Sequence, residues 1–269
     1  MNLVQQLING LILGHAYALI AIGWTVLLGV ARLVNFGHGQ MYMIGAFMAW
    51  WATAPLGLPY PAAILVAVGA GILLGLLVQA AMLRLTLEQN LVSIMIVTLG
   101  FGHVLRGAAA LAFGATPQIL ETPLSLIEFE VAGAWVTAQD GLIVAAAIGL
   151  FVVLRLVVER GGLGRAARMV AEDPKLAQLA GIDVKRVYLA VFAFEGAAVA
   201  LAAALVAPRT PILTSIGFEE VIIAFMVVVL GGIGSVAGSY VAGVGLGCST
   251  PCSAASCPRP TPPRPPSSF

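Results

Sequence analysis

The stretch LINGLILGHAYALIAIGWTVLLGV, residues 7–30, runs for 24 residues without an Asp, Glu, Lys or Arg. A helix of about 20 apolar residues is long enough to cross the hydrocarbon core of a bilayer. No Lys or Arg precedes the run and no small-residue cleavage site ends it, so we expect a retained first helix rather than a signal peptide. The stretch therefore predicts a membrane-embedded chain.

The rest of the sequence has the same character. Hydrophobic residues make up 60% and charged residues 9% of the 269 positions, whereas soluble domains carry about 25% charged residues. Further apolar runs are expected at 41–54, 62–83, 91–113, 142–158, 187–206 and 221–246. The run at 41–54 is short for a full crossing, so it could be tilted or re-entrant. The prediction is an all-α polytopic membrane protein with about seven transmembrane or re-entrant helices.

The charged residues orient these spans. The segment 159–186 is basic and contains Arg160, Arg165, Arg168, Lys175, Lys185 and Arg186. The segment 115–141 has no Lys or Arg and contains Glu121, Glu128, Glu130 and Asp140. Because cytoplasmic loops are enriched in Lys and Arg, the first segment is predicted to be cytoplasmic and the second periplasmic. The N-terminus then lies outside.

The chain divides by composition into two parts. Residues 1–247 form the predicted transmembrane domain, with residues 159–186 as its cytoplasmic loop. Residues 248–269 are rich in Pro, Ser and Cys and almost free of aliphatic residues, which predicts a disordered tail. The cysteines Cys248, Cys252 and Cys257 all lie there and are expected to be incidental thiols.

A short helix is predicted inside the cytoplasmic loop. Asp173 followed by Pro174 is typical of a helix start, and Gly181 of a helix stop. Leu176, Leu179 and Ala180 then share one apolar face. Such a helix could dock in a groove of another protein, or it could lie as a solvated helix on the membrane surface.

The glycine-rich stretch GGIGSVAG, residues 231–238, lacks the Gly-Lys-Ser/Thr ending of a phosphate-binding loop and lies inside an apolar run. Nucleotide binding is therefore excluded. Close helix packing is the favoured role of Gly231, Gly232, Gly234 and Gly238. The alternative is a broken helix that faces the transport pathway.

Polar residues at membrane depth are costly and usually face the protein interior or a water-filled cavity. Five such residues are candidates for lining a pathway: Asn35, His38, His103, Arg106 and Glu195. Glu195 and Arg106 could instead snorkel towards the nearer surface. Asn35 and His38, in a glycine-rich break, could merely cap helix ends.

Four stretches together resemble one known family. They are GLILGHAYALIAIGWTVLLGVARLVNFGHGQMYMIGAF (10–47), IVTLGFGHVLRG (96–107), RAARMVAEDPKLAQLAGIDVKRV (165–187) and VVVLGGIGSVAGSYVAG (227–243). Their order and spacing are similar to those of ABC importer permeases for branched-chain amino acids, of the LivH/LivM type. The likeness extends over residues 5–247.

The resemblance implies an inner-membrane permease subunit that imports leucine, isoleucine or valine by alternating access. It implies a second permease subunit, two cytoplasmic ATPase subunits and a periplasmic substrate-binding protein as partners, with no nucleic acid and no cofactor. The chain itself would not be an enzyme. The ATPase-coupling element would comprise Arg165, Arg168, Glu172, Asp173, Pro174, Leu176, Leu179 and Gly181.

Some alternatives stay open at this point. Permeases for urea, short amides or other amino acids belong to the same family, and an ion-coupled secondary transporter is a rival of another class. Members of the family continue past the glycine-rich helix into one more apolar span. Here Gly247 is followed abruptly by Cys-Ser-Thr-Pro-Cys, so we expect that final helix to be missing, through a frameshift in the gene or a sequencing artefact.

Overall fold

The computed structural model describes residues 3–85, 91–114, 116–131 and 133–249. The helices in these ranges are α1 (Leu3–Val30), α2 (His38–Thr53), α3 (Tyr60–Leu85), α4 (Leu91–Phe113), α5 (Ala138–Arg160), α6 (Gly162–Glu172), α7 (Pro174–Leu179), α8 (Val184–Val206), α9 (Ile216–Gly231) and α10 (Val236–Ser249). A small antiparallel hairpin is formed by β1 (Glu128–Val131) and β2 (Ala134–Thr137). Short 3-10 turns cover Pro123–Ser125 and Ala207–Arg209.

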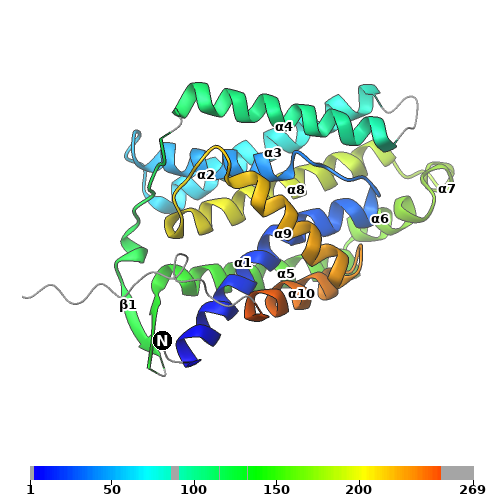
Figure 1. The fold of residues 1–269 in the computed structure, drawn as a ribbon. Helices are drawn as coiled ribbons and strands as arrows, with labels where there is room; N and C mark the ends of the chain where they lie inside the picture. The colour runs from blue at the N-terminus through cyan, green and yellow to red at the C-terminus, as the bar shows by residue number, and fades with distance from the viewer. Residues whose placement is uncertain (1–2, 86–90, 115, 132, 250–269) are drawn as a thin grey trace, which may run out of the picture.

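The predicted all-α polytopic membrane fold is confirmed. Among the described residues, five helices are long and apolar enough to cross a bilayer: 3–30, 60–81, 93–113, 138–158 and 184–209. The long helices run along one direction, with the hairpin at one end of the bundle and α7 at the other (Figure 1). We call these the hairpin end and the α7 end.

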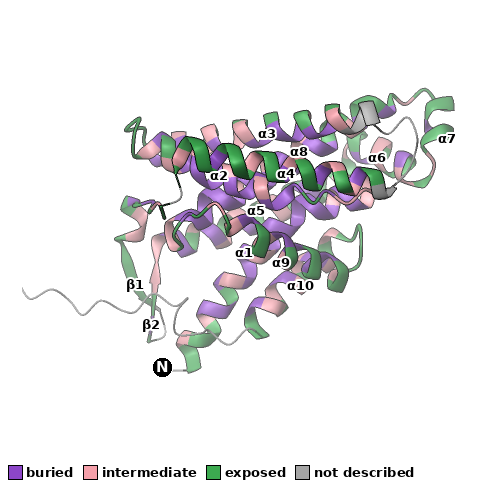
Figure 2. Ribbon diagram, turned by 45° about the horizontal axis from the view of Figure 1, so that its top comes forward, coloured by how far each residue is buried: buried purple, intermediate pink, exposed green. Residues whose placement is uncertain are grey.

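The centre of the bundle is formed by α1 and α8, which are buried through most of their lengths. The helices α3, α4 and α5 instead present large apolar side chains outward, and α4 in particular is exposed along its outer face (Figure 2). Apolar side chains on the outside of a bundle are stable only against hydrocarbon.

Close helix contacts depend on glycine at two crossings. Helix α3 runs antiparallel to α8, and a Cβ added at Gly71 would lie 2.2 Å from the Gly196 carbonyl oxygen. Helix α1 runs antiparallel to α10, where a Cβ added at Gly14 would lie 2.7 Å from the Val244 backbone. A side chain at either glycine would force the helices apart, so these positions set the helix spacing.

The short helices α2 and α9 occupy corresponding places. Each follows a long helix, α1 or α8, after a connecting segment, and each precedes a further helix, α3 or α10. Their first turns meet inside the bundle, where Cβ atoms added at Gly39 and Gly217 would each clash with the other's carbonyl oxygen. The segments α1–α3 and α8–α10 therefore share one order of long and short helices and run in opposite directions, as inverted repeats do in many transporters.

The prediction of one span over 221–246 is wrong. The apolar run is divided into α9 and α10 by a turn at residues 232–235. Gly232 and Gly234 have φ values of 88° and 82°, in the left-handed region that glycine adopts easily. Residues 231–235 contain no charged residue and no proline, so the sequence predicts one continuous apolar run across the turn.

The predicted tail begins two residues too early, because Cys248 and Ser249 belong to the last turn of α10. The remainder of the expected disordered tail, 250–269, lies outside the described residues, as does the expectation of a missing final helix.

Candidate coupling and transport sites

The segment that links α5 to α8 forms two helices at the α7 end. Gly161 ends α5 and immediately starts α6. Gly164 then packs against the end of α5 so closely that an added Cβ would lie 2.3 Å from the Val158 carbonyl oxygen. Asp173 caps α7 by accepting hydrogen bonds from the backbone N–H groups of Lys175 (2.7 Å) and Leu176 (3.2 Å). The helix start expected at Asp173–Pro174 is therefore present.

Helix α7 presents leucines to the outside. Leu176 and Leu179 are 63% and 85% exposed, while Ala177 on the opposite face is buried. Gly181, with φ of 83°, ends the helix, and α8 begins three residues later. An exposed pair of leucines beyond the end of the membrane-spanning bundle is a feature of interaction sites.

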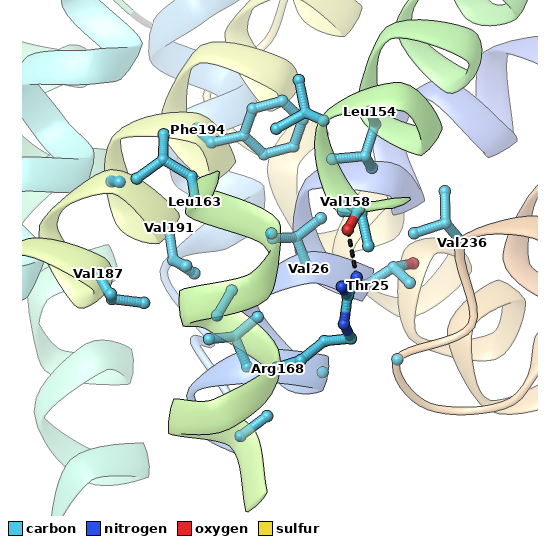
Figure 3. Close-up of a pocket in the computed structure, with 18 of the residues that line it drawn as sticks. Thr25, Val26, Leu154, Val158, Leu163, Arg168, Val187, Val191, Phe194 and Val236 are labelled. Atoms are coloured by element: carbon cyan, nitrogen blue, oxygen red, sulfur yellow. Dashed lines mark hydrogen bonds between the residues drawn. The ribbon is translucent and has the colours of Figure 1, made fainter. Parts of the chain in front are cut away.

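Helix α6 lies over an apolar cavity of about 380 Å³ (Figure 3). Its walls come from α1, α5, α6, α8 and the turn at 234–236. Arg168 lies at the edge, where its guanidinium donates a hydrogen bond to the Val158 carbonyl at the end of α5. This bond satisfies a carbonyl that the helix end leaves without an intrahelical partner. Of the residues predicted for coupling, Arg165 and Glu172 also lie on α6.

A polar cluster lies deep in the bundle. Asn35 Nδ2 donates to Glu195 Oε1 at 3.0 Å, and His38 Nδ1 lies 3.1 Å from the same oxygen. The other ring nitrogen of His38 lies 3.3 Å from the Ile20 carbonyl oxygen, near the middle of α1. Asn35 Oδ1 accepts from the Gly37 N–H at 2.9 Å. All three side chains are inaccessible to solvent.

Both ring nitrogens of His38 face oxygen atoms: Nδ1 faces Glu195 Oε1 and Nε2 faces the Ile20 carbonyl. A neutral ring can donate to one of these oxygens and an imidazolium to both. An imidazolium beside a carboxylate forms a pair without net charge, which lowers the cost of burying the carboxylate in the bundle.

Trp24 belongs to the cluster but was not predicted. Its indole stacks on the His38 ring with centroids 5.4 Å apart. Trp24 Nε1 and Glu195 Oε2 are buried, and neither has a hydrogen-bond partner among the described residues. Nothing in the sequence distinguishes Trp24 from a lipid-facing aromatic residue, because its partner lies in another helix.

The other two pathway candidates lie elsewhere. His103 and Arg106 are exposed residues of α4 and have no hydrogen bond to the cluster among the described residues. The structure thus brings together Asn35, His38 and Glu195 from positions up to 160 residues apart and leaves the α4 pair on the periphery.

The glycines of the 231–238 stretch have two different roles. Gly231 and Gly238 allow α9 and α10 to meet, since a Cβ added at Gly238 would lie 1.8 Å from the Gly231 carbonyl oxygen. Gly234 also lies against α1, where its Cβ would be 3.0 Å from the Gly29 Cα. A Cβ added at Gly232 would make only an ordinary contact, 3.9 Å from the Ser235 Cβ, so this glycine is required by its positive φ instead. Packing and the helix break therefore occur in the same stretch.

The hairpin end is held by polar contacts. The side-chain amide of Gln5 pairs with the Trp135 backbone, donating to its carbonyl at 3.0 Å and accepting from its N–H at 2.8 Å. Asp140 caps α5 together with Thr137 and also forms an ion pair with Arg209, which follows α8. These contacts fix the hairpin and the ends of α1, α5 and α8 relative to one another.

Comparison with known proteins identifies the family. Residues 6–256 match the family described as the permease component of branched-chain amino acid transport systems. The chain belongs to this family. It is therefore a permease component of an importer and a multi-pass protein of the bacterial inner membrane.

Several curated relatives are similar over most of the chain. The permease protein BraD of Pseudomonas aeruginosa, from a high-affinity branched-chain amino acid transport system, is 34% identical over 257 residues, which cover 91% of this chain and 84% of BraD. LivH of Escherichia coli K12 is 31% identical, with 94% of this chain and 86% of LivH covered. LivM of the same organism is 30% identical over 81% of this chain and 57% of LivM. No solved structure matches the chain significantly.

Proposed function

We propose that this chain transports leucine, isoleucine and valine into the cell as one of two permease subunits. The relatives BraD and LivH carry that substrate class in their names. Because relatives of both the LivH and the LivM type are found, a second permease subunit is the expected partner. Uptake of labelled leucine by cells that express the complete system tests the substrate. Competition by isoleucine and valine is expected, and competition by urea or acetamide instead would contradict it.

The energy is proposed to come from separate ATPase subunits that bind α6 and α7. The observation that supports this proposal is the exposure of Leu176 and Leu179. Both lie on α7, a helix that is capped by Asp173 and lies beyond the bundle. This helix belongs to the most basic loop of the chain. That loop is cytoplasmic by the distribution of Lys and Arg. An apolar face on a short helix is suited to a groove in another protein.

The experiment is a double substitution of Leu176 and Leu179 by Asn. Burying one leucine contributes about 1.5–3 kcal/mol, so loss of both is expected to weaken ATPase binding more than a hundredfold. Co-purification of the ATPase and leucine uptake should both fall, while the amount of permease in the membrane is unchanged. Gln178→Ala, on the same helix, is the matched control. Normal ATPase recovery with the double variant would refute the proposal.

The hairpin end is proposed to receive the substrate-binding protein. Phe129 and Trp135 are about half exposed, and Glu128 and Glu130 beside them are exposed as well. Aromatic side chains on a rigid support, next to carboxylates, fit a partner with a complementary basic surface. The amide pairing of Gln5 with Trp135 supplies the rigid support.

A further inference from the structure

The cavity under α6 is lined almost entirely by aliphatic groups. The lining includes Val26 of α1, Val157 of α5 and Val191 of α8, and the polar side chains among the lining residues are those of Thr25 and Arg168. The Thr25 hydroxyl already donates to the Ala21 carbonyl at 2.9 Å. A space of about 380 Å³ with this lining is unfavourable for water and large enough for a ligand.

The cavity opens towards the surroundings of the bundle. Its lining residues Val153, Val157 and Leu163 are 55%, 42% and 62% exposed, so its mouth is apolar. Its lining residues range from Val158, near the end of α5, to Phe194 of α8 (Figure 3). An aliphatic space with an apolar mouth is suited to an acyl chain from the surrounding membrane.

One cationic side chain, that of Arg168, lines the cavity. Arg168 lies at the edge, and the described residues offer its guanidinium the Val158 carbonyl as an acceptor, although a guanidinium carries five N–H donors. Arg160 and Arg165, on either side of the Gly161 turn, are exposed as well. The cytoplasmic leaflet is rich in anionic lipids, and basic pockets between transmembrane helices on that side bind their headgroups.

We propose that the cavity is a binding site for one anionic phospholipid of the inner leaflet. One acyl chain fills the space between α1, α5, α6 and α8, and the phosphate binds Arg168. The lipid then packs against the face of α6 that lines the cavity, and this face would otherwise border an unfilled apolar space. This site is distinct from the exposed leucines of α7 and does not depend on which substrate is transported.

The test uses the purified full-length chain in phosphatidylcholine nanodiscs. A phosphatidylglycerol probe with a photoactivatable group on one acyl chain is compared with a phosphatidylcholine probe with the same chain. Cross-links are mapped by mass spectrometry. Peptides that contain 153–158 and 187–194 should be labelled about fivefold more by the anionic probe, since one Arg near an anionic headgroup contributes about 1 kcal/mol.

Two variants examine the two halves of the site. Arg168→Gln should remove the preference for the anionic probe, whereas Arg186→Gln should not, because Arg186 is exposed and ion-paired with Asp183. Ala190→Phe fills the cavity and should abolish labelling there. Ala145→Phe, on the exposed face of α5, should leave the labelling unchanged.

Labelling of α4 by the same probe serves as a measure of folding, because α4 faces lipid far from the cavity. If Ala190→Phe keeps α4 labelling but leaves cavity labelling unchanged, no acyl chain occupies the cavity. If Arg186→Gln lowers the anionic preference as much as Arg168→Gln, only general attraction to the surface is present. Either result overturns the proposal.

Discussion

Glu195→Ala is expected to destabilise the bundle because it removes a hydrogen-bond acceptor that two buried side chains share. Asn35 Nδ2 keeps only the weak acceptor Met41 Sδ at 3.6 Å, and His38 Nδ1 loses Glu195 Oε1, in a site that solvent does not reach. Each buried donor without a partner costs about 1–3 kcal/mol, which gives about 2–6 kcal/mol. Measured polar contacts between membrane helices average about 0.6 kcal/mol, because the unfolded chain also finds partners. We therefore expect a loss of about 2–3 kcal/mol, near the lower limit.

Glu195→Gln should cost about half as much. The amide oxygen can still accept from Asn35 Nδ2 and His38 Nδ1, but the amide carries no charge that would balance an imidazolium. A neutral ring donates from one nitrogen, so either the Ile20 contact or the contact with residue 195 is lost. One lost bond corresponds to about 1 kcal/mol.

The assay is reversible unfolding in mixed micelles with increasing dodecyl sulfate, followed by tryptophan fluorescence. Trp24 lies on the His38 ring, so the cluster itself contributes to the signal. Glu219→Ala, at an exposed glutamate of α9, is the matched control and should change the unfolding free energy by less than about 0.5 kcal/mol. If Glu195→Ala is no less stable than this control, the cluster does not stabilise the fold.

Other substitutions test the packing and the hairpin end. Gly39→Ala should destabilise the fold by about 1–3 kcal/mol or more, because its Cβ would lie 1.7 Å from the Gly217 carbonyl oxygen. Gly69→Ala, with no atom within 4 Å of its Cβ, should instead be neutral or stabilise α3 by up to about 1 kcal/mol, and equal effects at the two sites would contradict the glycine contact. Arg209→Gln should cost about 1–3 kcal/mol by leaving the Asp140 carboxylate without its cation, as measured by the same unfolding assay. An unchanged unfolding midpoint would show that the Arg209 pair is not stabilising.

Local sequence signals predicted the parts of this molecule that depend on neighbouring residues. The uncharged run at 7–30 predicted α1, and Asp173 with Pro174 predicted the start of α7. A capping side chain and its backbone partners are only two or three positions apart, so the sequence contains the whole interaction.

Contacts between distant residues could not be predicted in this way. Glu195 was singled out as a costly polar residue, but its partners Asn35 and His38 lie about 160 positions away. The sequence likewise gave no reason to prefer these residues over His103, which the structure leaves on the outer face of α4. Pairing of side chains from different helices depends on where the backbones are placed, and that is a property of the packed bundle.

The sequence by itself determined that the chain lies in a membrane, where most of its spans occur and which loop is basic, because apolar length and charge are sums over adjacent residues. Only the tertiary structure decided that the last apolar run reverses direction at residues 232–235, that two short helices meet at Gly39 and Gly217, and that a cavity lies under α6. A glycine that allows a turn and a glycine that allows close helix packing are the same residue in the sequence. They differ in φ and in the atoms that surround them, which are fixed when the helices assemble.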